Sequence, residues 1–378
     1  MPTLMSLDCR HEFPEMPVPE NTELMMKRLH KHCRTRHAPL LLAIVLAVAC
    51  LGPTASLVAQ QAASDTVHVW DQDGEGQTQL RGTILAYDKN MITLMGISGR
   101  QQQIASARVA RIESHWEKSQ LEADEAFAAR EFEKAGRFYR QALETEMRGW
   151  ARHRLIAQVA WCQQSAGRWA DAGKTFLSVV MKSNPNTPYF DAIPLAWTIP
   201  NVTPQMEQLG KSWLVDEQSN AANLVGASWL LATEHREQAI RVLKGLTVSQ
   251  DRQIAFLAET QLWRTQVPIA TEATITSWEK MLQRMPAPLR AGPFHLLGKA
   301  LWRTGRKQDA MIAWMRVPLQ YPRHRLLAAE SLLSAARRYQ EMEKRDQATT
   351  LYRELITGYP GTIAAQAAQD QLETLLDK

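Results

Sequence analysis

Recognisable catalytic signatures are absent from the sequence. None of the patterns CxxC, HExxH, GxSxG, GxxxxGK[ST] or GxGxxG occurs, which removes the usual evidence for redox, zinc-protease, serine-hydrolase and nucleotide-binding enzymes. The histidines after residue 59 lie singly, without a histidine three or four positions away as a helical metal site would use: His68, His115, His153, His235, His295 and His324. We therefore expect no enzyme activity, no catalytic residues, no metal site and no cofactor.

An apolar run long enough to span a bilayer is also missing. The stretch from Leu40 to Leu51 ends at Gly52 and Pro53, well short of the roughly 20 residues that a spanning helix needs. Small residues up to Ala59 follow it, and basic residues precede it at Lys27, Arg28, Lys31, Arg34 and Arg36. This order is typical of a secretory signal peptide. We expect residues 1–59 to be a cleaved leader, the protein to be exported to the periplasm or the extracellular space, and no transmembrane segment to remain.

Residues 1–24 fit a signal peptide less well than residues 27–59 do. Residues 1–24 carry Asp8, Glu12, Glu15, Glu20 and Glu23, although the start of a signal peptide is normally basic. We hypothesise that translation starts at Met25 or Met26. N-terminal sequencing of the unprocessed protein tests this hypothesis.

Cysteine is scarce, with four in 378 residues. Cys9, Cys33 and Cys50 lie in or before the leader, so the mature chain keeps only Cys162 and forms no internal disulfide. Stability must therefore come from packing. Cys50 loosely resembles the cysteine of a bacterial lipoprotein box, although the leucine of that box is displaced by one position, and a lipid anchor there stays an alternative.

Charge of one sign is not concentrated anywhere in the mature chain. The net charge is +5, and beyond the first 40 residues no Lys/Arg run is long enough to follow a phosphate backbone. We expect no nucleic-acid partner.

With 45% hydrophobic and 22% charged residues, the chain has the composition of a folded protein. Its 378 residues are more than one compact core usually contains. Several domains are expected.

Strand periodicity covers residues 66–114. Short alternating runs are separated by turn residues such as Asp88 to Asn90, and the runs lie at 67–69, 83–87, 91–94, 103–105 and 109–112. Five strands in about fifty residues predict a small all-β barrel. The segment from Arg81 to Ile112 resembles the SH3-like or Sm-like barrels at the front of bacterial envelope proteins.

Asp71 and Gly76 match the first half of a calcium-binding loop. Gly82 stands where that loop needs a bidentate Glu, so we expect a solvated loop without calcium.

Helical periodicity replaces the strand pattern after residue 114, and it carries an internal repeat. Three columns recur in register: a small residue, a second small residue twelve positions later, and a bulky apolar residue four positions after that. Two antiparallel helices approach closely where both side chains are small, and the bulky residue fills the groove beside the contact. The columns are Ala123, Ala160, Ala227, Gly298 and Ala336; Ala135, Ala172, Ala239, Ala310 and Ala348; and Tyr139, Phe176, Leu243, Trp314 and Tyr352.

This signature resembles the tetratricopeptide repeat, whose unit of about 34 residues has the same small, small, large order. The resemblance implies a mainly α fold, an α-solenoid of helical hairpins, over residues 117–183 and 219–378. With the β barrel in front, the protein is α+β overall and multidomain. Gly167 and Gly305 lie five positions before the second small residue, where a turn is required, whereas Glu234 and Glu343 replace that glycine. A sixth, poorer unit uses Ala258 and Trp278.

A proline-rich stretch interrupts the repeat at residues 184–218. Its prolines are too many for a continuous helix, so we expect an insertion between hairpins. The aromatic residues Tyr189, Phe190 and Trp197 are expected to fold back onto the solenoid.

A partner-binding surface follows from the resemblance, which implies that the first helix of each hairpin lines a concave face. Positions one and four past the small residue place aromatic side chains beside cations, which suit an extended peptide or an anionic group. Trp161 and Trp302 are equally consistent with core residues that fill a groove. The candidates are Trp161, Gln164, Lys299, Trp302, Arg303, Arg337 and Gln340.

The expected function is a non-catalytic protein-interaction scaffold of the bacterial cell envelope that binds a protein or peptide on this concave face. Two alternatives stay open. One is an envelope-associated enzyme or enzyme accessory with a cryptic site in residues 184–218, and it predicts convergent polar residues in a pocket there. The other is a structural element that the β module attaches to the wall or to another subunit.

Overall fold

A computed structural model describes residues 64–71, 76–198 and 202–376. The expected leader, the lipoprotein-like Cys50 and the alternative start at Met25 or Met26 lie outside these residues. None of the described helices combines the length and apolarity needed to cross a membrane. The described residues form two compact units, which are taken separately below: the first comprises 64–83 and 94–115, and the second comprises 84–93 and 116–376.

The five predicted strands are all present: β1 (Asp65–Trp70), β2 (Gln77–Tyr87), β3 (Met91–Gly96), β4 (Gln101–Ala105) and β5 (Val109–Glu113). They form one sheet in the order β4-β3-β2-β1-β5. Val67 of β1 lies opposite Leu80 of β2 and Ile112 of β5, with a bulge between His68 and Val69. The sheet is open, because its edge strands β4 and β5 are not paired with each other in the described part of the chain. The closed barrel that we predicted is therefore corrected to an open sheet.

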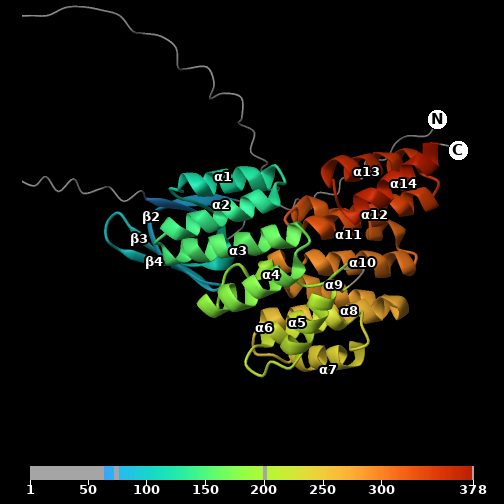
Figure 1. Cartoon of the computed structure of the whole chain (residues 1–378), viewed down its shortest axis with the longest axis horizontal. Coiled ribbons are helices and arrows are strands. Elements are labelled where there is room, and N and C mark those ends of the chain that lie inside the picture. Colours follow the sequence, from blue (N-terminus) through green and yellow to red (C-terminus); the bar gives the residue numbers. More distant parts are fainter. Residues whose placement is uncertain (1–63, 72–75, 199–201, 377–378) are drawn as a thin grey trace, which may run out of the picture. The chain divides into compact units, whose positions relative to one another are not determined.

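The second unit is dominated by antiparallel helical hairpins, as the repeat predicted (Figure 1). Within the described residues the closely packed neighbouring pairs include α1/α2, α3/α4, α5/α6, α6/α7, α10/α11 and α12/α13, and α14 packs on α13. The helices α8 and α9 meet through the stacked rings of Trp263 and Trp278. We call α1 to α14 the helical array. The bounds are α1 (Lys118–Ala128), α2 (Phe132–Thr145), α3 (Gly149–Ser165), α4 (Trp169–Thr175), α5 (Pro204–Leu214), α6 (Asn220–Leu230), α7 (Arg236–Leu246), α8 (Arg252–Gln266), α9 (Glu272–Arg284), α10 (Ala291–Arg303), α11 (Lys307–Gln320), α12 (Arg325–Glu341), α13 (Arg345–Gly358) and α14 (Ile363–Leu376).

The three repeat columns are buried at every position, which confirms the packing argument. All ten small residues are at most 9% exposed, and the five bulky residues are at most 2% exposed. Gly298 illustrates the fit, because a Cβ atom on it would lie 2.6 Å from the indole Nε1 of Trp314. The sixth unit is also present: Ala258 is in α8 and Trp278 is in α9, and both are buried.

The turns inside four of the hairpins share one backbone conformation. Gly167 and Gly305 have φ angles of +76° and +88°, in the left-handed region where glycine carries no steric penalty. Arg130 and Glu343 take the same place in their hairpins, with φ angles of +65° and +60°. The turn geometry is therefore kept even where the sequence has no glycine.

The proline-rich stretch packs onto the array and is partly helical. Phe190 is 2% exposed, and Tyr189 and Trp197 pack against the buried core as predicted. The carbonyl of Pro194 accepts a hydrogen bond from the Trp229 indole at 2.8 Å. The second half forms α5, because Pro204 lies in the first turn of that helix, where its missing N–H is not needed. Within residues 184–218 the described chain is irregular at 184–198, apart from a short 3-10 turn at Phe190–Ala192, and helical at Pro204–Leu214.

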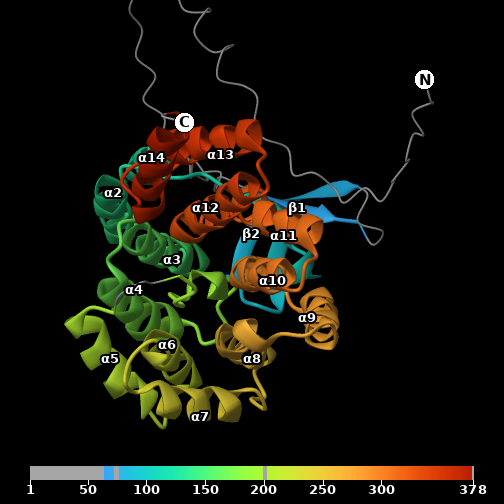
Figure 2. The ribbon, with the colours of Figure 1, turned by 90° about the vertical axis from the view of Figure 1, so that its right-hand side faces the viewer.

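The first and last hairpins of the array meet. The guanidinium of Arg130, in the α1/α2 turn, donates to the carbonyl of Thr357 in α13 at 3.1 Å. The Arg325 guanidinium, at the start of α12, lies over the ring of Phe132 in α2 at 5.3 Å. Figure 2 shows α6, α8, α10 and α12 toward the middle of the array, and each of these helices packs on the next. The array therefore closes on itself.

Candidate binding site

The predicted site residues separate into two places. Trp161 and Gln164 of α3 are 2% and 7% exposed, so both are largely buried. The Gln164 amide donates to the carbonyl of Ala192 at 2.7 Å, and the Trp161 ring meets His324 edge to face at 4.7 Å. Both side chains therefore hold the proline-rich stretch and the α11–α12 loop against α3.

The second place is a charged surface on α8, α10 and α12, and we call it the inner face. It is formed by Arg264, Lys299, Glu330, Arg337 and Arg338. Lys299 is exposed to solvent, yet desolvation lowers its pKa, which Glu330 partly offsets. Burial also lowers the pKa of Arg264 to about 10. The inner face therefore combines two exposed cations, Lys299 and Arg337, with two that are partly covered by protein, Arg264 and Arg338.

Trp302 of α10 borders the inner face and is half-buried. The Arg338 guanidinium and the Lys307 ammonium lie over its ring at 5.3 and 5.4 Å. On the α11 side, the centroid of its ring lies 6.3 Å from that of Trp314. Trp302 therefore has features of both roles considered for it: its ring packs against Trp314 within the hairpin, and two cations lie over the ring.

Two of the predicted residues serve the fold. The Arg303 guanidinium donates to the carbonyl of Ala270 at 3.0 Å, which fixes α10 to the turn of the α8/α9 hairpin. The side-chain oxygen of Gln340 accepts from the Tyr352 hydroxyl at 2.7 Å, which joins α12 to α13. Of the remaining predicted residues, Lys299 and Arg337 are exposed to solvent and Trp302 is half-buried.

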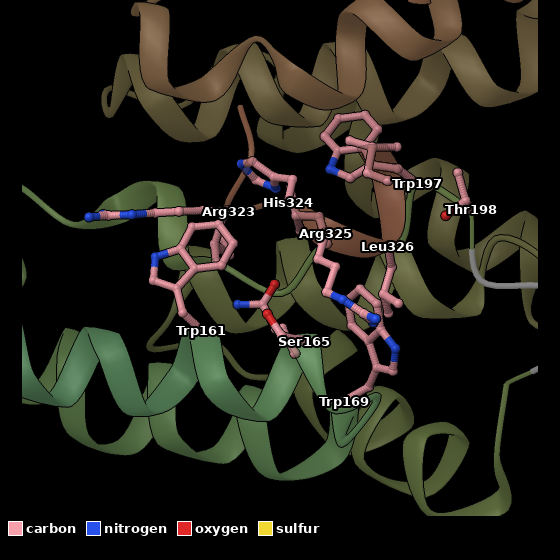
Figure 3. A pocket seen from close by; sticks show the side chains of 13 residues that line it. Trp161, Ser165, Trp169, Trp197, Thr198, Arg323, His324, Arg325 and Leu326 are labelled. Carbon is pink, nitrogen blue, oxygen red and sulfur yellow. The ribbon is translucent and has the colours of Figure 1, made fainter. Parts of the chain in front are cut away.

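A pocket lies where α3 meets the α11–α12 loop and the proline-rich stretch, and we call it the seam pocket (Figure 3). Its empty volume is about 410 Å³, counting the solvent at its mouth. In Figure 3 the rings of Trp161 and Trp169 rise from one side, and Trp197 and residues 323–325 approach from the other. The described lining consists of Trp161, Gln164, Ser165, Trp169, Ile193, Leu195, Trp197, Thr198, Arg323, His324, Arg325, Leu326 and Leu327.

The seam pocket is aromatic and cationic. Arg323 is exposed, whereas Arg325 donates to the carbonyl of Pro360 and lies over Phe132. Burial, reinforced by the nearby Arg323, lowers the pKa of His324 to about 4, so His324 is neutral at pH 7. Among the described lining residues none is Asp, Glu or Cys. The two arginines therefore supply positive charge that no lining carboxylate offsets.

Sequence reasoning found only part of this pocket. Trp161, Gln164 and Trp197 were singled out, but Arg323, His324 and Arg325 were not, because they follow Pro322 where α12 begins and belong to no repeat column. The signal was present as three consecutive cationic or titratable residues that lead into a helix. Only the closure of the array brings that segment to α3, and no local pattern encodes the closure.

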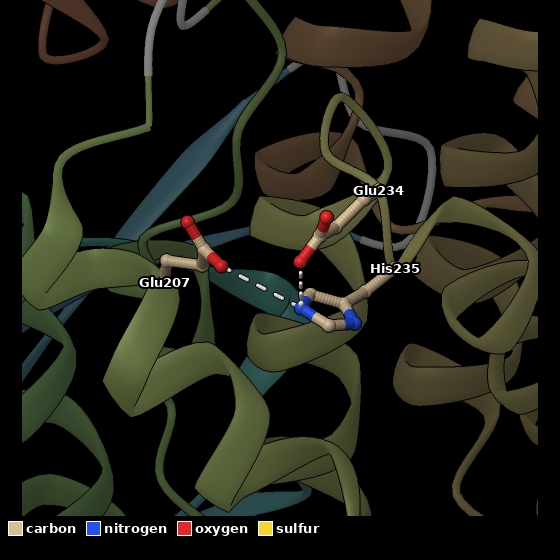
Figure 4. A group of neighbouring side chains, drawn as sticks. All are labelled: Glu207, Glu234 and His235. Atoms are coloured by element: carbon tan, nitrogen blue, oxygen red, sulfur yellow. Dashed lines mark ion pairs between the residues drawn. The ribbon is translucent and has the colours of Figure 1, made fainter.

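One grouping of possible metal ligands occurs in the described chain, at Glu207, Glu234 and His235 (Figure 4). The His235 Nε2 lies 3.5 Å from a Glu207 oxygen and 3.4 Å from a Glu234 oxygen. The same Glu207 oxygen is paired with the Lys211 ammonium at 2.6 Å, and this contact comes first among the causes that lower the pKa of Glu207. An ammonium at the same oxygen competes with a cation, so we read the group as an ion-pair cluster.

The remaining reactive side chains are buried in the array. Burial raises the pKa of the Cys162 thiol to about 12, so the thiolate that a nucleophile needs is not formed at pH 7. His295 is fully buried, and its Nδ1 lies 2.9 Å from the Ser331 hydroxyl. The Ser331 hydroxyl also lies 2.9 Å from the Leu327 carbonyl, to which it donates. Because the Ser331 proton is used for Leu327, the His295 Nδ1–H donates to the Ser331 oxygen. Both side chains lie between the packed helices α10 and α12.

Comparison with known proteins adds little to this description. No family model matches the chain, and no curated protein matches it. Among solved structures, the chain is similar to one described as the TPR2AB-domain:pHSP90-complex of yeast Sti1, with 16% identity over 69% of this chain and 98% of that chain. The TM-score is 0.22, which is too low to carry an argument about fold or partner. The architecture therefore rests on the helices and contacts described above.

Proposed function

We propose that the helical array is a non-catalytic scaffold of tetratricopeptide-like hairpins that binds a partner protein or peptide on its inner face. The observation that carries the proposal is the excess of positive charge on the inner face, where Lys299 and Arg337 are exposed to solvent. Exposed ammonium and guanidinium groups form charge-assisted hydrogen bonds with an incoming carboxylate. The inner face is therefore suited to an acidic, extended partner segment.

The balance of charge supports an acidic partner. On the inner face Lys299 and Arg337 act on Glu330, whose pKa is raised by burial, and Arg264 and Arg338 lie near Lys299. Four cations therefore stand against one carboxylate. Arg338 is also paired with Glu341, but Arg337 is exposed. Mutual repulsion among these cations is relieved when a negatively charged segment binds, which favours complex formation.

The absence of enzyme activity is part of the proposal. The seam pocket gives some support to the alternative of a cryptic site in residues 184–218, because Thr198, Arg323 and His324 are polar residues that line it. What disfavours catalysis there is the missing acid–base pair, because the lining described has no carboxylate and His324 is held neutral. We therefore favour recognition over catalysis at this place.

Location in the cell envelope after export is the second part of the proposal. It rests on the basic and apolar order of residues 27–59 in the sequence. We expect the secreted protein to begin at residue 60. N-terminal sequencing of the mature protein and its recovery from the envelope fraction test this expectation, and a mature chain that retains residues 27–59 would contradict it.

The test of the scaffold compares partner recovery by the full chain and by two double variants. Lys299→Gln with Arg337→Gln removes two inner-face charges, at exposed side chains that pack little, so the fold should persist. Partners cross-linked to the wild type and identified by mass spectrometry should fall at least tenfold in recovery, as expected for the loss of charge-assisted hydrogen bonds.

The matched control carries the same chemical changes on outward-facing helices. Lys244→Gln and Arg353→Gln remove one lysine and one arginine that are exposed on α7 and α13. This control should retain wild-type recovery. Equal recovery with both double variants would remove the inner face as the binding surface.

A further inference from the structure

We propose that the seam pocket is an anchor site for an aromatic side chain of the partner that has an acidic residue as its neighbour. The inference rests on the proposed function, since it names a second contact with the same partner. It concerns a different surface from the inner face, because the pocket is built from α3, residues 193–198 and the α11–α12 loop.

The aromatic half of the ligand follows from the indole rings. Trp169 and Trp197 are half-buried and line the pocket, and Trp161 closes it beside His324 (Figure 3). Trp197 is held in place, because its ring fills the space that a Cβ on Gly292 of α10 would occupy, at 2.0 Å. Rigid indoles around a small cavity are the setting in which one partner aromatic contributes most to binding.

The acidic half follows from unmatched donors. Arg323 is exposed and makes no hydrogen bond to any described residue, although Asp191 acts on it electrostatically from outside the lining. In Figure 3 the side chain of Arg325 crosses the pocket toward Trp169, so a second positive charge lies near the site. The exposed Arg323 guanidinium can donate to a ligand carboxylate, and such charge-assisted hydrogen bonds are stronger than neutral ones.

The same chemistry argues against two other ligand classes. A quaternary ammonium suits an aromatic cage, but here Arg323 and Arg325 would repel it. A neutral sugar carries no charge, so it would leave the arginines without the counter-charge that a ligand carboxylate provides. An anionic group attached to an apolar, flat body satisfies both halves of the pocket.

The test uses blocked dipeptides and the full chain. N-acetyl-Phe-Glu-amide is titrated while the indole N–H signals of Trp169 and Trp197 are followed by NMR, after assignment with single Trp→Phe variants. We expect both signals to shift with saturation, and N-acetyl-Phe-Gln-amide and N-acetyl-Ala-Glu-amide to bind at least tenfold more weakly. Loss of one charge-assisted hydrogen bond is of this size.

Two variants separate the pocket from the general charge of the protein. Arg323→Glu reverses the exposed cation at the pocket and should weaken the Phe-Glu dipeptide at least tenfold. Arg241→Glu reverses an exposed cation on α7 and should leave its affinity unchanged. The inner-face variant Lys299→Gln with Arg337→Gln should also bind the dipeptide normally, so failure of the scaffold proposal and failure of this inference give different results.

Two results would overturn the inference. The first is equal binding of the Phe-Glu and Phe-Gln dipeptides, or no shift of the Trp169 and Trp197 signals at millimolar dipeptide. The second is adenosine monophosphate shifting the same signals at a lower concentration than the dipeptide, which would make the pocket a nucleotide site.

Discussion

Replacement of Gly226 by alanine tests how closely the insertion helix α5 approaches the repeat helix α6. A Cβ atom on Gly226 would lie 2.6 Å from the carbonyl oxygen of Gly210 and 2.8 Å from the amide nitrogen of Leu214. Both atoms belong to the backbone of α5, so no side chain can rotate away. The two helices would have to separate, and the contact would be lost along its length.

The size of the effect follows from two opposing terms. Alanine in a helix interior is more favourable than glycine by about 0.5–1 kcal/mol. Overpacking of a close contact costs about 1–3 kcal/mol, and the upper end applies here because the obstructing atoms are backbone atoms. We expect Gly226→Ala to lower the free energy of unfolding by about 2 kcal/mol.

Gly245 of α7 provides the matched control. It is also a helical glycine, but a Cβ atom there would meet nothing within 4 Å. Gly245→Ala should therefore raise the free energy of unfolding by about 0.5–1 kcal/mol, because only the propensity term remains. Urea denaturation followed by far-UV circular dichroism measures both variants against the wild type. If both shift the midpoint in the same direction, the close approach of α5 to α6 is refuted.

Two further predictions concern a turn and a titration. Glu343→Gly should stabilise the protein by about 1 kcal/mol in the same assay, because Glu343 has a φ angle of +60° that glycine adopts without strain; an unchanged midpoint contradicts this. The pKa of His324 is lowered from 6.5 to about 4, so between these values the unfolded chain binds more protons than the folded one and stability falls as the pH drops. Urea midpoints from pH 7 to 4.5 should fall less steeply for His324→Gln. The buried His295, whose pKa is also lowered, leaves a residual slope of the same sign, and an unchanged slope refutes the assignment to His324.

The hairpins were predictable because their contacts are local in sequence. Ala123 and Ala135, like Gly298 and Ala310, lie twelve residues apart and are buried in the two packed helices of one hairpin. The packing of each hairpin is therefore visible within a short stretch of sequence. The sheet was predicted strand by strand for the same reason. The prediction that the sheet closes into a barrel was wrong, because pairing between β4 and β5 depends on twist and register, which the alternation of apolar residues does not report.

The site was harder to predict because it depends on contacts that are distant in sequence. Ala227 was recognised from its column, but the neighbouring Gly226 faces the insertion helix α5, which belongs to no repeat. In the same way, Trp161 was placed on a face of α3 without its partner His324, 163 positions away along the chain. A periodic pattern predicts which side chains share a face and not which distant loop covers it.

Closure of the array changes what the concave face can do. In an open solenoid Trp161 and Trp302 would lie on one continuous surface, and a single extended peptide could contact both. Here Arg130 and Arg325 tie the last hairpins to the first, and His324 covers the edge of Trp161. The predicted face is thereby divided into the inner face near Lys299 and the seam pocket near Arg323. A partner that uses both must present two separate acidic determinants, so loss of either one should weaken binding without abolishing it.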